Sequence, residues 1–204
     1  MIAGTPLCKI AQKYGTDKSP WVSETRWGHS YTPEYYKRFN PIREKVKKVL
    51  EIGIGTGHSM PRKVRHLPQY KTGASLFMWR EFFPNAQIFG IDILPECMVE
   101  GEDRIKTFIV DQANKNQLED LIKEIGDDID IVIDDGSHQS VHQVFTCSIL
   151  KRLLPKDVIY VIEDVKETAI SRVINNDGFD VEYNMFKPKH GFDDRLFWIT
   201  DHKK

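Results

Sequence analysis

Cysteine is scarce in this chain of 204 residues, which has three: Cys8, Cys97 and Cys147, far apart and without a CxxC spacing. An odd number of widely spaced cysteines argues against a disulfide framework or a thiolate zinc site, and is typical of reduced intracellular thiols. The sequence also lacks any apolar run close to the roughly 18 residues of a membrane helix. Its first residues lack the apolar core of a signal peptide. We therefore expect a cytoplasmic protein without a membrane span.

An excess of either charge is absent as well. The chain has 29 Lys and Arg residues against 30 Asp and Glu residues, for a net charge of -1. This balance excludes a general polyanion-binding surface, so we expect no nucleic-acid partner. Hydrophobic residues make up 40% of the chain, which argues against disorder and suits one α/β core. We therefore expect residues 1–204 to form a single domain.

From residue 46 onward, short β-branched runs alternate with helix-like stretches, the pattern of βαβ units and a mostly parallel sheet. After the last helix, "FDVEYNMF" and "DRLFWIT" are joined by a connection too short for a helical crossover, so they should pair antiparallel. This order predicts the Rossmann-like α/β sandwich of class I methyltransferases, a seven-stranded, mostly parallel sheet with an antiparallel last strand, although dinucleotide-binding dehydrogenases begin in the same way. The first five predicted strands are 47–54, 87–93, 105–111, 129–135 and 157–164, and the predicted helices are 74–83, 114–125, 139–153 and 167–175.

Residues 1–45 follow a different pattern, with the aromatic-rich stretch "HSYTPEYYKRF" before the Rossmann-like core of 46–204. The stretch predicts a helix with Thr32 as N-cap and Pro33 at the first helical position. Its residues Tyr35, Tyr36 and Phe39 would then pack on the sheet. The alternative is that the loop before this helix is a lid over a ligand.

A glycine-rich stretch, "LEIGIGTGHSM", follows the first predicted strand. Glycine there lets the backbone approach a ligand and adopt positive φ. A dinucleotide fingerprint would need a further glycine where His58 or Met60 stands, so the pyrophosphate interpretation is weakened. Asp92, at the end of the next strand, is placed to hold ribose hydroxyls. It lies farther after the first glycine, Gly53, than the usual ~20 residues. The combination favours an adenosine-bearing ligand without a pyrophosphate, S-adenosylmethionine.

Two acidic pairs end the fourth and fifth predicted strands, Asp134-Asp135 and Glu163-Asp164. Neighbouring strand residues point to opposite faces, so we expect one of the first pair to face the cofactor and one the acceptor. Converging carboxylates repel one another unless a cation neutralises them, and oxygen ligands without cysteine indicate Mg²⁺, Mn²⁺ or Ca²⁺. His138, three residues after Asp135, is then placed as a general base for a cation-bound alcohol.

Four alternatives remain open at this point. The Asp and Ser residues of "DDGSHQSVHQ" are ordinary N-caps for the following helix, although the second acidic pair favours a site. His142 lies on the same helical face as His138 but has no third ligand at zinc-like spacing, so a structural or supporting role is expected. A nicotinamide-dependent oxidoreductase is disfavoured by the missing glycine, and a nucleotide-binding regulatory subunit would use the acidic pairs as caps alone.

Several segments together resemble one enzyme family: "YGTDK", "HSYTPEYY", "LEIGIGTG", "GASLFMWREFFPNAQIFGIDI", "VDQ", and "IDDGSHQSVHQ" followed by "IED". They closely resemble the macrocin and mycinamicin sugar O-methyltransferases and related rhamnosyl O-methyltransferases, over nearly the whole chain. The resemblance implies S-adenosylmethionine, Mg²⁺ and a sugar hydroxyl as acceptor, with the 2-hydroxyl of a rhamnose-like deoxysugar as the first expectation.

The resemblance also implies roles for individual residues. The metal ligands would be Asp135, Glu163 and Asp164, with His138 as the base beside Asp135. Lys18 would meet the cofactor's carboxylate where the N-terminal segment closes over it. The residues expected at the cofactor are Thr16, Lys18, Glu51, Gly53, Gly55, Ser75, Asp92, Asp111, Gln112 and Asp134.

Metal-dependent catechol-type methyltransferases share this layout, which leaves a catechol or flavonoid acceptor as an alternative. His138, in place of the lysine expected of that group, and "YGTDK" favour the sugar. Compared with the macrolide enzymes, the chain lacks a long N-terminal domain and has an insertion at 58–74, so acceptor size and a possible homo-oligomeric state are left open. That insertion either shapes the acceptor cleft or is a solvated loop. Among its residues, the candidates to shape the cleft are Arg62, Lys63, Arg65, His66 and Tyr70.

Overall fold

The computed structural model describes residues 4–20, 28–56, 70–186 and 195–201, which fold around a seven-stranded sheet. The strands are β1 (Lys48–Ile52), β2 (Gln87–Asp92), β3 (Ile105–Ile109), β4 (Ile131–Asp134), β5 (Ile159–Ile162), β6 (Phe179–Met185) and β7 (Arg195–Asp201). Their order in the sheet is β3-β2-β1-β4-β5-β7-β6. The first five strands pair in parallel, whereas β7 pairs antiparallel with both β5 and β6. The predicted parallel sheet and its antiparallel closing pair are thus confirmed.

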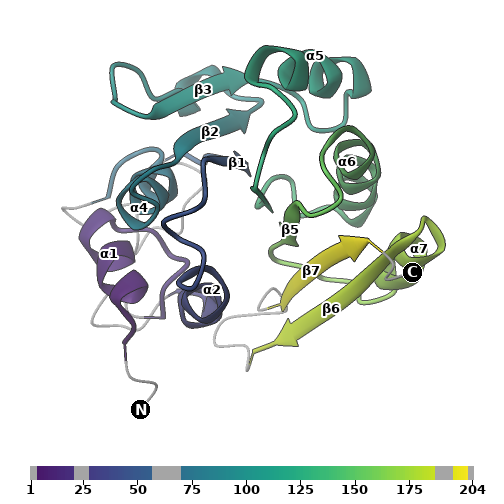
Figure 1. Cartoon of the computed structure of the whole chain (residues 1–204), viewed down its shortest axis with the longest axis horizontal. Helices are drawn as coiled ribbons and strands as arrows, with labels where there is room; N and C mark the ends of the chain where they lie inside the picture. Colours follow the sequence, from purple (N-terminus) through teal and green to yellow (C-terminus); the bar gives the residue numbers. More distant parts are fainter. Residues whose placement is uncertain (1–3, 21–27, 57–69, 187–194, 202–204) are drawn as a thin grey trace.

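Helices cover both faces of this sheet. Figure 1 shows α1, α2 and α4 on one side and α5, α6 and α7 on the other. The four helices predicted after residue 46 form within a few residues of their expected bounds. The helices are α1 (Pro6–Tyr14), α2 (Tyr31–Phe39), α4 (Ala74–Phe82), α5 (Lys115–Ile125), α6 (Ser140–Leu153) and α7 (Ile170–Asn176), with a short 3-10 helix, η1 (Pro95–Cys97).

Two apolar cores result, one on each face of the sheet. In β4, Ile131 and Ile133 join the core under α1, α2 and α4, while Val132 joins the core under α5, α6 and α7. Full burial of such a side chain stabilises the fold by about 1.5–3 kcal/mol. Because Ile52 is level with Asp134, and Asp134 with Ile162, strands β1, β4 and β5 end at one edge of the sheet. Residues that follow these strands therefore start close together.

The start of α2 differs from the prediction. The helix begins at Tyr31, with Ser30 as its N-cap residue and no side-chain capping hydrogen bond. The carbonyl of Lys18 accepts hydrogen bonds from the backbone N of Tyr31 (3.2 Å) and of Thr32 (3.1 Å). The hydroxyl of Thr32 contacts the thiol of Cys8 instead. The expectation of Thr32 as N-cap was wrong because a carbonyl from a distant segment caps the helix.

The three cysteines are free and buried, as expected for reduced thiols. Among the helices of the described residues, none combines the length and the apolar character that crossing a membrane requires. The cellular compartment stays a prediction.

Candidate active site

A cavity of about 680 Å³ lies along the edge where β1, β2, β4 and β5 end. Ligand sites of parallel α/β sheets form at this edge, and ligand cavities typically measure about 300–1,000 Å³. The loop after β1 contributes Gly53 and Gly55 to one end of the cavity, near Asp92 of β2. The loops after β4 and β5 contribute the residues of the two acidic pairs, apart from Asp134. The cavity therefore has a nucleotide end, formed by the predicted cofactor residues Gly53, Gly55 and Asp92, and an acid end, formed by Asp135, His138, Glu163 and Asp164.

At the nucleotide end, the Asp92 carboxylate organises the glycine loop. Its Oδ2 accepts hydrogen bonds from the backbone N of Ile54 (3.0 Å) and Gly55 (3.1 Å). Its Oδ1 accepts one from the backbone N of Leu94 (3.0 Å). Asp92 thus fixes the loops after β1 and β2 relative to each other, while it still borders the cavity.

Gly53 occurs where the loop after β1 passes the backbone of Asp135. Its φ is +86°, and an added Cβ would lie 2.1 Å from the Asp135 carbonyl oxygen. Gly53→Ala should therefore lower the free energy of unfolding by more than the roughly 1–3 kcal/mol that a strained φ costs, as measured by urea denaturation.

Gly101→Ala is the matched control for this prediction. Gly101 has a similar φ, +71°, but nothing lies within 4 Å of its added Cβ. The substitution at that position should add only the cost of a strained φ. Equal losses in the two variants would show that the approach of Gly53 to Asp135 has no energetic weight.

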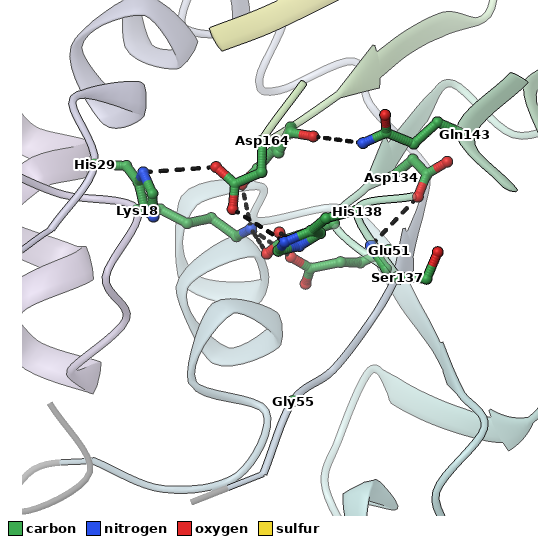
Figure 2. A network of polar contacts seen from close by, with 12 residues as sticks. Lys18, His29, Glu51, Gly55, Asp134, Ser137, His138, Gln143 and Asp164 are labelled. Atoms are coloured by element: carbon green, nitrogen blue, oxygen red, sulfur yellow. Dashed lines mark hydrogen bonds and ion pairs between the residues drawn. The ribbon is translucent and has the colours of Figure 1, made fainter. Parts of the chain in front are cut away.

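Lys18 lies at the centre of the acid end (Figure 2). Its Nζ is 2.5 Å from Asp135 Oδ2, 2.8 Å from Glu163 Oε2 and 3.2 Å from Glu51 Oε1, and its side chain is 2% exposed. The ammonium thus faces three carboxylates of the protein. The expected contact of Lys18 with a cofactor carboxylate stays a prediction.

His138 lies between the carboxylates of the two strand ends. Its Nε2 is 3.1 Å from Asp135 Oδ1, and its Nδ1 is 3.5 Å from Asp164 Oδ2. Both His138 and Asp164 adopt a left-handed backbone, with φ of 54° and 53°, a strained state that clusters at functional sites. Ligand atoms of Asp135, His138 and Asp164 all lie within 4.8 Å of one another. The two carboxylates of this set have the chemistry to hold a divalent cation beside the imidazole.

Side chains from the N-terminal segment complete the acid end, and sequence reasoning did not find them. The Tyr31 hydroxyl donates to Asp164, and the Tyr35 hydroxyl donates to Glu163 Oε1 at 2.6 Å. His29 Nδ1 is 3.6 Å from Asp164 Oδ1, and its ring stacks on Tyr31. The spacing of four between Tyr31 and Tyr35 was the available signal, because it places both hydroxyls on one helical face. Tyr35 also packs in the core, as predicted.

No family model matches the chain. Over 161 residues it is 37% identical to the 8-demethyl-8-alpha-L-rhamnosyl tetracenomycin-C 2'-O-methyltransferase of Streptomyces olivaceus, a match that covers 78% of this chain and 38% of that protein. Over 159 residues it is 35% identical to the Mycinamicin VI 2''-O-methyltransferase of Micromonospora griseorubida, covering 78% of this chain and 36% of that protein. The chain is homologous to sugar O-methyltransferases. It spans 33 to 38% of the length of five curated relatives.

Solved structures place this sugar O-methyltransferase homologue in a fold class. The MycE methyltransferase of the mycinamycin biosynthetic pathway, in complex with Mg, SAH and mycinamycin VI, matches with a TM-score of 0.71 and 24% identity. The match covers 98% of this chain and 54% of that one. The fold is that of class I Rossmann-like methyltransferases, as the strand order predicted.

The structure brings most of the predicted site residues of this homologue to one cavity. The exceptions are Glu51 and Asp134, which are buried and do not line the cavity. Contact of any of the predicted residues with the cofactor stays a prediction. Glu51 accepts a hydrogen bond from the Ser75 hydroxyl at 2.8 Å. The predicted residues that line the cavity are Thr16, Lys18, Gly53, Gly55, Ser75, Asp92, Asp111, Gln112, Asp135, His138, Glu163 and Asp164.

Among the predicted metal ligands, Glu163 stands apart. Its two carboxylate oxygens accept from Lys18 and from Tyr35, respectively, and it is not part of the three-residue group formed by Asp135, His138 and Asp164. Its role as a ligand stays a prediction.

The neighbouring carboxylates set the protonation state of His138. Burial lowers the pKa of His138, but the hydrogen bond and charge of Asp135, with the charges of Asp164 and Glu163, raise this pKa to about 9. The imidazole is therefore protonated at neutral pH when no other cation is bound. A divalent cation on Asp135 and Asp164 would oppose the charges that raise the pKa, and so favour the neutral imidazole that a base requires.

Asp134 turns to the α6 side of the sheet, away from Asp135, as the alternation along β4 predicts. Its Oδ1 accepts from Gln112 Nε2 (3.2 Å) and from the backbone N of Gly136 (3.3 Å). Gln112 Oε1 in turn accepts from the backbone N of Ser137 (2.7 Å). Asp134 and Gln112 thus hold the loop of Gly136 and Ser137 from the α6 side of the sheet. This loop leads to His138.

Burial raises the pKa of Asp134 to about 7, against the hydrogen bonds from Gly136 and Gln112 that lower it. The folded state then binds this proton more tightly than the unfolded state, so stability falls as pH rises from about 4 to about 7. Asp134→Asn removes this loss. Relative to the parent, the variant should gain stability between pH 5 and pH 8, on the order of 4 kcal/mol at most, measured by urea denaturation at both pH values.

Asp128→Asn is the control for this pH dependence. Asp128 is exposed, and a hydrogen bond from Lys48 lowers its pKa. Both folded and unfolded states are then ionised between pH 5 and pH 8, and its difference from the parent should stay constant. A constant difference for Asp134→Asn as well would show that Asp134 titrates normally.

The basic insertion residues Arg62, Lys63, Arg65 and His66 lie outside the described residues, and so do His58 and Met60. Tyr70, at the end of the insertion, lines the cavity. His142 also lines it, and its Nδ1 is 2.9 Å from the Ser137 hydroxyl, which agrees with the supporting role expected for it.

Proposed function

We propose that this chain is an S-adenosylmethionine-dependent, divalent-cation-assisted O-methyltransferase that acts on a sugar hydroxyl. Five curated relatives, at 31 to 38% identity, are all O-methyltransferases. Because the chain spans only part of their length, its own geometry has to support the activity. The observation that carries the proposal is the imidazole of His138, held between Asp135 and Asp164 at the edge of a cavity that also reaches Asp92 and the glycine loop.

The residues present fit both implied groups. An adenosyl ligand would lie at the end of the cavity where Gly53, Gly55 and Asp92 form its wall, and the volume of about 680 Å³ leaves room for an acceptor as well. A divalent cation of the Mg²⁺ type would be held by the carboxylates of Asp135 and Asp164, with Glu163 as the further predicted ligand. Oxygen donors of this kind suit hard cations.

S-adenosylmethionine, when bound, supplies a methyl group on an activated sulfonium, and a divalent cation lowers the pKa of a hydroxyl that it binds. The protein must orient the acceptor and take its proton. The ionised Asp135 can only accept, so its Oδ1 fixes the tautomer of His138 that carries hydrogen on Nε2, 3.1 Å away. Nδ1 is then the atom that takes the proton of the acceptor hydroxyl.

We propose the 2-hydroxyl of a rhamnose-like deoxysugar, in a glycan or a glycoside, as the first acceptor to test. Two relatives support this position by name, the 2'-O-methyltransferase of the rhamnosyl tetracenomycin and the 2''-O-methyltransferase of mycinamicin VI. Other relatives are named for a 3'-O or a 3-O position, so a rhamnoside blocked at either hydroxyl would distinguish the two.

A methyl-transfer screen with Mg²⁺ or Mn²⁺ over simple rhamnosides, fucosides and catechols, detected by mass spectrometry, tests the proposal. We expect a methylated rhamnoside that disappears when the cation is chelated. Preferential methylation of a catechol would replace the sugar by the alternative acceptor. Calorimetry adds a second test: S-adenosylhomocysteine should bind with roughly micromolar affinity, and binding of NAD in its place would overturn the methyltransferase assignment.

A further inference from the structure

The ammonium of Lys18 occupies the place that a cation would take in the acid end. It lies within 3.2 Å of oxygens of Asp135, Glu163 and Glu51. Glu51 and Glu163 are 0% and 1% exposed, and Lys18 is 2% exposed. Buried carboxylates need a positive partner, because water is not there to solvate them. Lys18 supplies that partner without any bound ion.

Lys18 also competes for the oxygens that the sequence assigns to a metal. It binds Asp135 Oδ2 and Glu163 Oε2, and Glu163 Oε1 is held by Tyr35. Glu163 therefore becomes a metal ligand only if the ammonium leaves. Asp135 Oδ1 binds His138 and not Lys18, so the departure of the ammonium would leave the base in its place.

We propose that Lys18 is an internal cation that the divalent ion displaces from Asp135 and Glu163 when it enters the site. This inference rests on the proposed function, because it assumes that the site takes a divalent ion. The backbone of Lys18 stays fixed, since its carbonyl accepts from the first backbone N–H groups of α2. The exchange is thus a movement of the long, flexible side chain alone, between the buried cluster and the cavity that Lys18 also lines.

The inference predicts a change in cation affinity, measured by calorimetric titration of Mn²⁺ without cofactor or acceptor. Lys18→Met removes the competing charge, and a unit charge about 4 Å away is a strong opponent of a second cation. We expect the variant to bind Mn²⁺ at least roughly tenfold more tightly than the parent, a difference of about 1.4 kcal/mol or more. Lys18→Arg, which keeps the charge, should stay closer to the parent.

Lys13→Met is the matched control. Lys13 lies in the same N-terminal segment, but it is 58% exposed and pairs with Glu81, and neither residue lines the cavity. Its removal should leave Mn²⁺ affinity unchanged. Unchanged or weaker affinity in Lys18→Met, with Mn²⁺ bound by the parent, would overturn the inference and leave the proposed function standing. If neither protein binds Mn²⁺, both the inference and the cation in the proposed function fail.

A measurement on the parent protein covers the case in which Lys18→Met does not fold. Lysine acetylation by a water-soluble reagent is compared with and without Mn²⁺ and mapped by peptide mass spectrometry. Displacement brings the Lys18 amine from the buried cluster into the open cavity, so its acetylation should rise severalfold with Mn²⁺ while that of Lys13 stays constant. Constant or reduced acetylation of Lys18 with Mn²⁺ bound would contradict displacement.

Discussion

His138→Ala should lower the rate of methyl transfer by roughly 10² to 10⁴, the usual contribution of a positioned general base. The imidazole lies between Asp135 and Asp164, where it can take a proton from a hydroxyl bound there. Calorimetric affinity for S-adenosylhomocysteine should remain close to that of the parent, because His138 lies at the acid end of the cavity. Turnover and binding measured on the same preparation separate the two effects.

His142→Ala is the control variant for this prediction. His142 follows His138 by four residues and lines the same cavity, but its contact is the Ser137 hydroxyl and not a carboxylate. We expect a loss of turnover well below that of His138→Ala. A larger loss for His142 would transfer the role of the base to it. Loss of S-adenosylhomocysteine binding in His138→Ala would assign His138 to the cofactor.

Lys18→Met should lower the free energy of unfolding by about 3–5 kcal/mol at neutral pH when divalent cations are chelated, the cost of leaving buried charges without a partner. Burial lowers the pKa of Lys18, but the charges of Asp135, Glu163 and Glu51 raise this pKa well above the usual range. The ammonium is therefore charged in the folded protein and compensates these carboxylates. Urea denaturation in the presence of a chelator measures the loss.

Three further measurements identify the cause of that loss. Lys13→Met removes an exposed lysine and should leave the unfolding curve nearly unchanged, because surface pairs contribute little. Adding Glu163→Gln to Lys18→Met removes one uncompensated charge and should restore part of the stability. Lowering the pH should shrink the deficit, because the carboxylates then become protonated. A deficit that neither the second substitution nor acid reduces would point to lost packing.

The strand ends could be predicted because local composition and topology decide them together. Short β-branched runs such as "IDIVIDD" end in acidic residues, and parallel strands bring those ends to one edge. The opposite directions of Asp134 and Asp135 also followed from the alternation of side chains along a strand. The structure shows the shared edge and the opposite directions: Asp135 borders the cavity, and Asp134 lies in the polar contacts on the α6 side. That one of them faces the cofactor and the other the acceptor stays a prediction.

The partners of the acid end could not be predicted, because they come from distant parts of the chain. Lys18 is 117 residues from Asp135 and 145 residues from Glu163, and Tyr31 is 133 residues from Asp164. Spacing rules describe neighbours on one helix or strand and carry no information over such separations. The same reason explains the misplaced start of α2, where the carbonyl of Lys18 replaces the expected side-chain cap.

The N-terminal segment was expected either to pack on the sheet or to cover a ligand. Tyr35 and Phe39 pack in the core, as the simpler interpretation expected. Thr16, Asp17, Lys18 and His29 line the cavity, which is compatible with a covering function. That this segment acts as a lid stays a prediction.

The positive φ angles of His138 and Asp164 restrict which residues can replace them in protein engineering. Asparagine, aspartate and histidine tolerate such a backbone better than other residues with a side chain, and β-branched residues tolerate it least. A redesign that installs lysine at position 138, to imitate the base of catechol-type enzymes, would alter both the stereochemical fit and the proton acceptor. Asparagine at position 138 is the cleaner probe, because it keeps a side chain suited to a positive φ while removing the basic nitrogen.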